Sequence, residues 1–218
     1  MRESPGAAGR VRPQEDTELL AGALSDESLP PGAAVLDVGT GTGALALAAA
    51  RRGARVTAVD VSRRAVWTAR LNAARAGLPL RVRRGNLFDP VRGETFDLVL
   101  ANPPYVPAPG AGRRPRGAAR AWDAGHDGRL LLDRIGDEGP GVLRPGGVLL
   151  LVQSALADPE RTVAHLRAGG LKAAVVRRRR IAFGPVVRGR EHWLRRRGLL
   201  SASEQNEELV VVRAERPV

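Results

Sequence analysis

Short apolar runs alternate with longer amphipathic segments along most of the chain. The clearest runs are residues 33–38, 55–59, 96–101 and 148–152, which are rich in Val, Leu and Ala. Runs of this length favour strands that are covered on both faces, as in parallel sheets. The segments between them have the length and polarity of surface helices. The pattern therefore predicts an α/β fold with a mostly parallel sheet and helices on both faces.

Weaker signals complete the predicted order of elements. Residues 80–83 form a short third strand, and residues 171–176 and 208–212 are two late strands, which brings the predicted strands to seven. We expect the late strands to pair as an antiparallel hairpin at one sheet edge. Helices are expected from Asp16 or Thr17 to Leu24, over 45–52, from Ser62 to about Ala76, over 129–142, and from Asp158 to Gly169. Ser, Thr and Asp at the starts and Gly at the ends are common helix caps.

The chain has 218 residues, a length that suits one α/β domain with a sizeable core. We divide it into residues 1–30, an amino-terminal extension whose helix would pack over the site, and residues 31–218, the main domain, with an arginine-rich insertion at 177–206. Residues 1–12 lack the apolar segment of a signal peptide, and no apolar stretch is long enough for a membrane helix. We expect a cytoplasmic protein with no membrane partner.

Arginine dominates the charge of the chain. The 35 basic residues outnumber the 23 acidic ones, which gives a net charge of +12, and every basic residue except Lys172 is arginine. This excess is compatible with a nucleic-acid partner, with residues 177–180 as the densest run, and equally with the composition of a GC-rich genome. The absence of cysteine excludes disulfides and thiolate metal sites. Three scattered histidines have no ligand spacing, so we expect no metal.

A glycine-rich turn follows the first predicted strand. Gly39, Gly41 and Gly43 lie between residues 33–38 and the next helix, and Asp60 ends the second strand. Glycines let the backbone approach a ligand, a helix amino end favours an anionic group, and a carboxylate suits two ribose hydroxyls. This unit predicts a nucleotide-like ligand. It also fits the dinucleotide pattern of an NAD-type oxidoreductase, and a purely structural turn is a third interpretation.

The fourth predicted strand ends in the sequence Asn102-Pro103-Pro104-Tyr105. Pro103 keeps Asn102 out of the helical region, so the backbone leaves the sheet as a rigid turn. The Asn102 amide oxygen and the Pro103 carbonyl can both accept from one planar –NH2 group, and Tyr105 can lie against the flat group that carries it. A turn that only closes the strand is the alternative. Hydride transfer has no evident use for an amide-binding turn, so this turn, together with Asp37 just before the glycines, argues against an oxidoreductase.

Two further segments lie at predicted strand ends. Asn86 and Asp89 follow the third strand and should face the same crevice. Residues 106–121 form a loop rich in Pro, Gly and Arg. His126 follows this loop and could be a catalytic base, but a loop histidine beside a glycine is more often a surface residue, and we interpret it as one.

The order of these motifs resembles that of the class I S-adenosylmethionine methyltransferases. The resemblance runs from residues 35–43 through Asp60 and the Asn102 turn to residues 143–147, and so covers nearly the whole chain. The Asn-Pro-Pro-Tyr turn is similar to that of the amino-methylating branch, which contains adenine and cytosine amino methyltransferases and the HemK-type glutamine methyltransferases. Residues 13–17 and 122–128 look most like the small HemK2 or Mtq2 subgroup.

The resemblance implies a single-domain Rossmann-like fold and S-adenosylmethionine as cofactor, with S-adenosylhomocysteine as product. It implies catalytic roles for Asn102, Pro103, Pro104 and Tyr105, and cofactor-binding roles for Thr17, Asp37, Gly39, Thr40, Gly41, Gly43, Asp60, Val61, Asn86, Leu87 and Asn102. The chain departs from the family at Asn86, where Asp is usual, and at Ala124, where Gly is common. The Asn86 carbonyl can still accept from the adenine amine.

The acceptor implied by the resemblance is a glutamine side chain in a protein, which in the better-known members belongs to a Gly-Gly-Gln tripeptide of a translation release factor. The alternative is a nucleic-acid base, at adenine N6 or cytosine N4, which the basic carboxy-terminal segment would serve. A cofactor-binding module without activity is a third interpretation. Eukaryotic and archaeal relatives use a small zinc-binding activator subunit, and the sequence leaves open whether this chain needs one.

Overall fold

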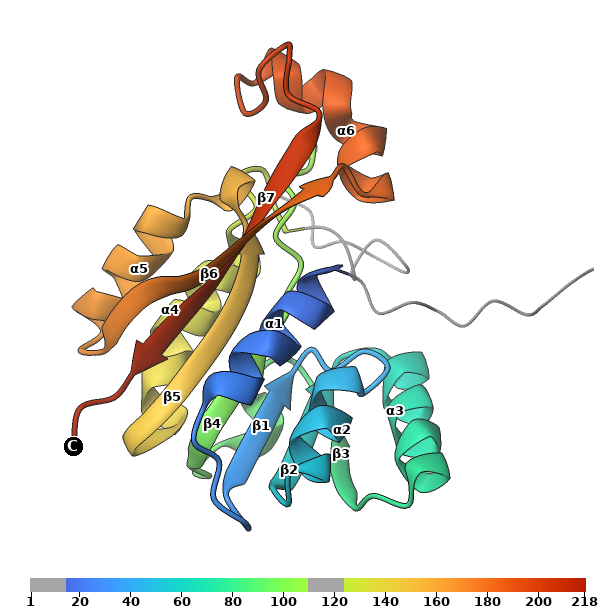
Figure 1. Ribbon diagram of the computed structural model, residues 1–218, viewed down its shortest axis with the longest axis vertical. Coiled ribbons are helices and arrows are strands. Elements are labelled where there is room, and N and C mark those ends of the chain that lie inside the picture. The colour runs from blue at the N-terminus through green and yellow to red at the C-terminus, as the bar shows by residue number, and fades with distance from the viewer. Residues whose placement is uncertain (1–14, 110–123) are drawn as a thin grey trace, which may run out of the picture.

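A computed structural model of the chain describes residues 15–109 and 124–218. Its middle layer is a seven-stranded sheet in the order β3-β2-β1-β4-β5-β7-β6 (Figure 1). The strands are β1 (Ala34–Val38), β2 (Arg55–Asp60), β3 (Leu80–Arg84), β4 (Phe96–Ala101), β5 (Leu143–Ser154), β6 (Lys172–Ala182) and β7 (Asn206–Glu215). The helices are α1 (Glu15–Asp26), α2 (Ala44–Arg51), α3 (Arg63–Ala76), α4 (Leu130–Val142), α5 (Pro159–Ala168) and α6 (Pro185–Arg196).

The first five strands run parallel, and β7 runs antiparallel to both of its neighbours, β5 and β6. This confirms the predicted seven-stranded, mostly parallel sheet with a carboxy-terminal antiparallel hairpin. The predicted late strands are too short, however. Pairing between β6 and β7 continues across a register shift after Val175 as far as Ala182 and Asn206. The arginines at 177–180 therefore belong to a strand, and the segment between the two strands is residues 183–205.

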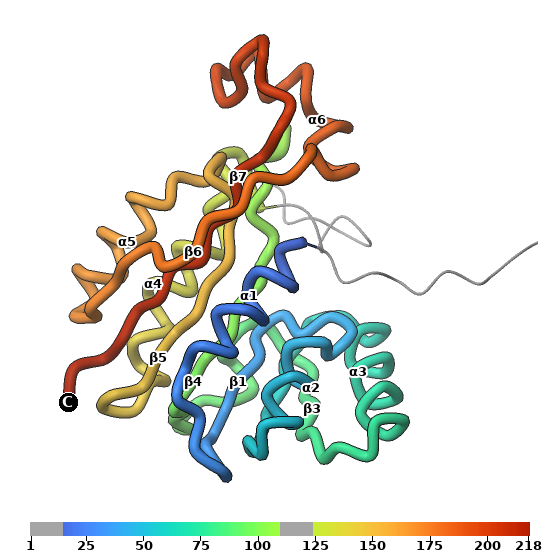
Figure 2. The backbone as a smooth tube through the Cα atoms, viewed as in Figure 1, coloured from blue at the N-terminus to red at the C-terminus, as the bar shows by residue number. Residues whose placement is uncertain are grey.

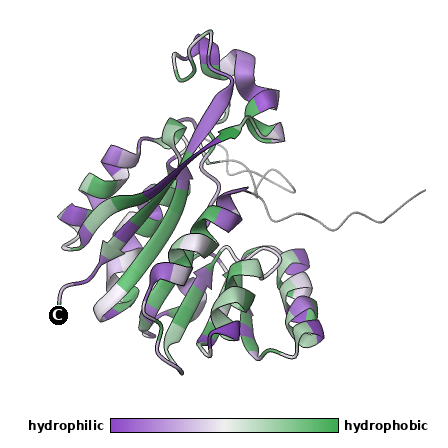
Figure 3. Cartoon of the chain, in the orientation of Figure 1, coloured by the Kyte–Doolittle hydropathy of each residue, from purple (hydrophilic) through white to green (hydrophobic). Residues whose placement is uncertain are grey.

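Helix α6 lies within that segment and was not predicted. Its only buried residues are Val187 and Leu194, and arginines occupy much of the rest, so the apolar stripe that identifies a surface helix is too thin to detect. In Figures 1 and 2 the hairpin carries α6 beyond the main body of the sheet. Figure 3 shows hydrophilic colour over much of the hairpin and α6, whereas the central strands are mainly hydrophobic.

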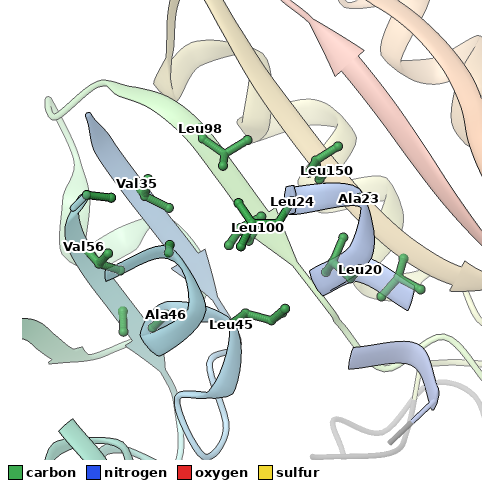
Figure 4. Packing of buried hydrophobic residues seen from close by; sticks show 14 of the residues in the cluster. Leu20, Ala23, Leu24, Val35, Leu45, Ala46, Val56, Leu98, Leu100 and Leu150 are labelled. Carbon is green, nitrogen blue, oxygen red and sulfur yellow. The ribbon is translucent and has the colours of Figure 1, made fainter. Parts of the chain in front are cut away.

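Helices cover both faces of the sheet, as predicted. One core cluster joins α1, α2 and α3 to the sheet, and the other joins α4 and α5 to the opposite face. Leu20 and Leu24 of α1 are fully buried in the first cluster with Leu100 and Leu150 (Figure 4). Burying each such leucine stabilises the fold by about 1.5–3 kcal/mol. Hydrophobic burial thus fixes α1 on the sheet, although it precedes the first strand.

A third, smaller cluster fastens α6 to the rest of the chain. Its buried members are Val106, Phe183, Val187, Leu194 and Leu200, and Tyr105 packs against it. Residues 183–205, between β6 and β7, therefore contact the segment that follows β4. Among the residues described, no helix is both long enough and apolar enough to cross a bilayer.

Candidate active site

The candidate site lies where the strand order reverses. From β1 the chain builds outward through β2 and β3, and then returns to add β4 on the other side of β1. Val38 and Ala101 are register partners at the carboxyl ends of these two strands. Gly39 and Asn102 consequently leave the sheet next to each other. Open α/β sheets bind their ligands at such a switch point.

The glycine turn has a backbone that requires glycine. Gly39, Gly41 and Gly43 have φ values of 72°, 55° and 85°, in the left-handed region that other residues rarely adopt. A Cβ on Gly39 would have as its nearest neighbour the Asn102 carbonyl oxygen, at 3.9 Å, and one on Gly41 would meet nothing within 4 Å. A Cβ on Gly43 would lie 3.2 Å from the Ala69 Cβ of α3. The first two glycines therefore leave open space at the switch point, and the third allows close helix packing.

The Asp37 carboxylate stabilises this turn through hydrogen bonds. Its Oδ2 accepts from the Thr40 hydroxyl at 2.5 Å and from the Ala46 backbone N–H, in the first turn of α2, at 3.0 Å. Burial raises the pKa of the Asp37 carboxyl to about 6, against the opposing effect of these two hydrogen bonds. Its Oδ1 is buried and finds no hydrogen-bond partner among the described residues. Asp37 thus joins the glycine turn to α2 and keeps one acceptor unused beneath it.

The predicted nucleoside-binding residues lie at the ends of β2 and β3. Asp60 is partly buried, and its two oxygens accept from the backbone N–H groups of Gly41, at 2.9 Å, and Ser62, at 2.8 Å. Each carboxylate oxygen keeps a second lone pair for a further donor. Val61 is 42% exposed beside it. Leu87 has a φ of 47°, a strained value for a residue with a side chain, directly after the exposed Asn86.

The first turn of α1 forms hydrogen bonds with both ends of the Asn-Pro-Pro-Tyr turn. The Asn102 side-chain nitrogen donates to the Thr17 hydroxyl at 3.3 Å. The Tyr105 hydroxyl donates to Asp16 Oδ2 at 3.0 Å, and Asp16 Oδ1 accepts from the Thr17 backbone N–H at 2.6 Å. Burial, followed by the nearby carboxylates of Asp16 and Glu207, raises the pKa of Tyr105 well above its usual value of 10. Tyr105 is therefore a neutral hydroxyl donor at physiological pH.

Two acidic residues of this site were missed. Asp16 was expected only as a helix cap, yet it is 9% exposed and bonded to Tyr105. Glu207 of β7 is 5% exposed, bonds Ser154, and has an Oε1 atom without a partner among the described residues. Burial, and to a lesser degree Asp16, raises the pKa of Glu207. The predicted packing of the amino-terminal helix over the site pointed toward Asp16, whereas no sequence signal identifies Glu207, because only the tertiary fold brings β7 to the end of β4.

Other predicted positions lie apart from this arrangement or outside the described chain. Asp89 is exposed and pairs with Arg92. The His126 ring packs against Trp193 of α6, with ring centroids 5.4 Å apart, and its Nδ1 lies 3.1 Å from an Arg197 nitrogen. His126 is thus partly buried, and its interpretation as a surface residue without a catalytic role stays a prediction. Residues 13–14 and 122–123 lie outside the described residues. In the described part of the chain, no three His, Cys, Asp or Glu side chains are grouped as a metal site.

The fold and this site together define the protein as a class I S-adenosylmethionine-dependent methyltransferase. The open space at Gly39 and Gly41 and the spare lone pairs of Asp60 fit that cofactor. A comparison with protein families identifies the particular one. The profile of the methyltransferase small domain matches residues 1–112, about half of the chain. The chain belongs to this family.

Two relatives support the same assignment. The chain is 35% identical over 172 residues to a putative protein N5-glutamine methyltransferase of Methanocaldococcus jannaschii. The aligned region covers 78% of this chain and 85% of the relative. It is 40% identical over 155 residues to a release factor glutamine methyltransferase of Gloeobacter violaceus. The aligned region covers 67% of this chain and 54% of the relative. The chain spans about half the length of several such release factor enzymes.

Solved structures share the fold. The Mtq2–Trm112 complex of E. cuniculi, described as responsible for methylation of the eRF1 termination factor, superposes with a TM-score of 0.66 and 25% identity over 94% of this chain and 96% of that one. The T. thermophilus 16S rRNA N2 G1207 methyltransferase, solved with S-adenosylmethionine and guanosine, gives a TM-score of 0.62 and 22% identity over 96% of this chain and 44% of that one. At 22% identity the second likeness concerns the fold.

Proposed function

We propose that this protein transfers a methyl group from S-adenosylmethionine to the side-chain nitrogen of a glutamine, and that the acceptor protein is a translation release factor. The names of the relatives motivate the acceptor, since they include a putative protein N5-glutamine methyltransferase and release factor glutamine methyltransferases. The local chemistry agrees, because the chain presents an amide and a proline carbonyl, two acceptors suited to a planar –NH2 group. Release factors act in the cytoplasm, where we propose that this enzyme works.

One observation carries the proposal. The Asn102 amide nitrogen is already committed to Thr17, and within residues 15–109 and 124–218 no donor bonds its oxygen. An amide held by its nitrogen presents its oxygen as an acceptor. Because Val38 and Ala101 are register partners, Asn102 lies next to Gly39 at the switch point. The acceptor-binding group and the cofactor-binding turn therefore adjoin each other.

The chemistry proposed for Asn102 is positioning. An amide nitrogen is a poor nucleophile because its lone pair is delocalised into the carbonyl. When Asn102 Oδ1 and the Pro103 carbonyl accept its two hydrogens, they orient the nitrogen and concentrate its lone pair. That pair forms the new N–C bond, the C–S bond of the sulfonium breaks with its electrons passing to sulfur, and the methylated nitrogen then loses one proton to water. Bound S-adenosylmethionine supplies the electrophilic methyl group.

The remaining assignments concern binding. We propose that Gly39, Thr40, Gly41 and Gly43 surround the methionine part of the cofactor and that Asp60 binds its ribose. Val61, Asn86 and Leu87 lie at the strand ends where the adenine would rest. Asp37 acts through the turn that it holds, and Thr17 lies at the junction of cofactor and acceptor. Tyr105 and Pro104 complete the wall against which the flat acceptor amide would lie.

The test is product chemistry. The protein is incubated with methyl-labelled S-adenosylmethionine and purified release factor, or with total RNA and DNA, and the products are digested and analysed by mass spectrometry. We expect N5-methylglutamine in the release factor. Label found only as N6-methyladenine or N4-methylcytosine would overturn the proposal and establish base methylation in its place.

We further propose a small activator subunit, by analogy with the Mtq2–Trm112 complex. Adding the corresponding small zinc-binding protein should raise the turnover of this chain and form a one-to-one complex in size-exclusion chromatography. Full activity of the chain alone, unchanged by the added subunit, would contradict this.

A further inference from the structure

The run of arginines at 177–180 takes no part in the proposed reaction. Two of these arginines contact α1, the helix that bonds the acceptor-binding turn. We propose that α1 is a positioning element for the acceptor-binding turn: Thr17 orients the Asn102 amide, Asp16 holds Tyr105, and Arg177 and Arg179 of β6 hold α1 in place. This rests on the proposed function of Asn102 and extends it to residues outside the turn.

The first contact sets the orientation of the catalytic amide. An asparagine side chain can present either its oxygen or its nitrogen to a neighbour, and the wrong face would offer a donor to the acceptor nitrogen. Thr17 Oγ1 accepts from Asn102 Nδ2 at 3.3 Å, which leaves the oxygen for the substrate. The hydroxyl of Thr17 also lies 3.3 Å from Asp16 Oδ1, to which it donates. With its proton used in this way, the hydroxyl is an acceptor toward Asn102.

The second contact holds the far end of the turn. Tyr105 donates to Asp16 Oδ2 at 3.0 Å, while Oδ1 of the same carboxylate accepts from the Thr17 backbone and side chain. One carboxylate thus connects both ends of the Asn-Pro-Pro-Tyr turn to two consecutive residues of α1. Asp16 is only 9% exposed, so little water competes with these hydrogen bonds.

Arginines of β6 hold the two ends of α1. Arg179 contacts Glu15 at 3.0 Å and Glu18 at 3.5 Å, on the turn that carries Asp16 and Thr17. Arg177 donates from Nε to Asp26 at 3.1 Å, at the other end of the helix. The guanidinium of Arg177 also lies so close to Gly22 that a Cβ there would come within 2.6 Å of it.

The alternation of the strand separates these arginines from their neighbours. Side chains of a strand point to opposite faces in turn, so Arg177 and Arg179 share the face that α1 covers. Arg178 lies on the opposite face, where it contacts Glu160 of α5 at 3.8 Å and Glu208 at 2.8 Å. Arg180 is exposed on that face as well. Three of the four positive charges are thus paired within the molecule, and two of them are paired with α1.

The decisive comparison is Thr17→Val against Thr17→Ser. Valine keeps the shape but cannot accept from Asn102, and serine keeps the hydroxyl. We expect Thr17→Val to lower kcat by about 10- to 100-fold, since small misplacements of a reacting group cost that much. The KM for the acceptor and the melting temperature should change little. Thr17→Ser should stay within about threefold of the wild type in kcat, as expected when the hydroxyl itself is what matters.

An acceptor-independent measurement separates this inference from the proposed substrate. The chain has four asparagines, Asn72, Asn86, Asn102 and Asn206, so asparagine-labelled protein gives a simple side-chain amide NMR spectrum. The Asn102 amide should be protected from exchange in the wild type and in Thr17→Ser, and unprotected in Thr17→Val. If label appears in a different acceptor, the same kcat ratio is measured on that acceptor. Unaltered Asn102 signals and unaltered kcat in Thr17→Val would overturn the inference.

The arginine contacts have a matched control. Arg179→Glu places a negative charge against Glu15 and Glu18, and Arg180→Glu makes the same charge change on the opposite face of the strand. We expect Arg179→Glu to lower kcat about 3- to 10-fold, in line with the modest strength of partly exposed ion pairs. Arg180→Glu should stay within about twofold of the wild type. Equal effects of the two variants would show that α1 is held by its hydrophobic face alone and would remove the arginines from the proposal.

Discussion

Gly39 and Asn102 leave adjacent parallel strands side by side, and a Cβ built on Gly39 would have the Asn102 carbonyl oxygen as its nearest neighbour, at 3.9 Å. This relationship follows from the pairing of Val38 with Ala101, the last residues of β1 and β4. The turn that would hold the methyl donor and the turn that would hold the acceptor therefore meet at one point. Substitutions on the two sides of this point should separate cofactor binding from turnover.

Asp60→Ala should weaken S-adenosylmethionine binding at least tenfold. Hydrogen bonds to a charged group contribute about 1.5–3 kcal/mol each, and a loss of 1.4 kcal/mol already corresponds to tenfold. Isothermal titration calorimetry measures this directly. Asp89→Ala is the control, because Asp89 lies at the next strand end but, among the residues that the structure describes, forms its ion pair with the exposed Arg92. Equal affinities of the wild type and Asp60→Ala would exclude the ribose role.

Asn102→Ala should abolish turnover while leaving the cofactor Kd within about threefold of the wild type. The reason is that its side-chain oxygen is proposed to contact the accepting nitrogen, whose interaction with the enzyme strengthens in the transition state. Single-turnover kinetics with the true acceptor, together with calorimetry, distinguish the two effects. A variant with near-normal kcat would show that another group orients the acceptor.

Asp37 should make the protein less stable as the pH rises. Its folded-state pKa of about 6 lies above the usual aspartate value of 3.8, so the folded state retains the proton between these values and the unfolded state releases it. The stabilisation is complete below about pH 3.8 and is lost as the pH rises through 6. At 1.36 kcal/mol per pKa unit, the loss is about 3 kcal/mol.

Asp37→Asn checks this sign. The difference in unfolding free energy between the wild type and Asp37→Asn, measured with urea, should shift by about 2.4 kcal/mol in favour of the variant between pH 4 and pH 7. Comparing the two proteins removes the contribution of the other carboxyl groups. A difference that is constant across this range would mean that Asp37 titrates as an ordinary exposed carboxyl.

Tyr105 is the only tyrosine in the chain, which makes its ionisation directly observable by ultraviolet absorbance. In the wild type it should ionise well above pH 10, because the hydroxyl is buried beside Asp16 and Glu207. Asp16→Asn removes a negative charge and should lower the pKa of Tyr105. Glu160→Gln, at an exposed position on α5, is the control and should leave the titration unchanged. Identical curves for all three proteins would contradict the Asp16 contact.

Gly128→Ala should disturb the acceptor turn and destabilise the fold. Gly128 has a φ of 78°, and a Cβ there would lie 2.3 Å from the Tyr105 carbonyl oxygen, so the backbone must shift. The left-handed conformation alone costs alanine about 1–2 kcal/mol. Gly189→Ala is a matched control, because Gly189 lies within α6 with nothing near its Cβ, and alanine there should be stabilising by about 0.5–1 kcal/mol. Thermal unfolding compares the two, and equal melting temperatures would refute the steric argument.

The sequence by itself determined the parts of this protein that depend on local chemistry. Apolar runs such as Phe96–Ala101 favour buried strands, glycines permit the positive φ values of the turns, and the two prolines at 103 and 104 restrict the backbone without help from distant residues. The seven strands and the hairpin at the sheet edge followed from these features, the methyltransferase class and the cofactor followed from the resemblance that the motifs carry, and all of them were confirmed. The proposed cofactor and acceptor turns were recognised in the same way.

The tertiary structure decided which distant residues meet. Asp16 and Glu207 have no unusual neighbours in the sequence, and they join Tyr105 only because α1 packs on the sheet and β7 inserts between β5 and β6. The arginines at 177–180 form one positive run along the chain, but the alternation of a strand sends Arg177 and Arg179 to α1 and Arg178 to α5. Their partners are set by hydrophobic burial elsewhere in the fold, which a local pattern of charge does not contain.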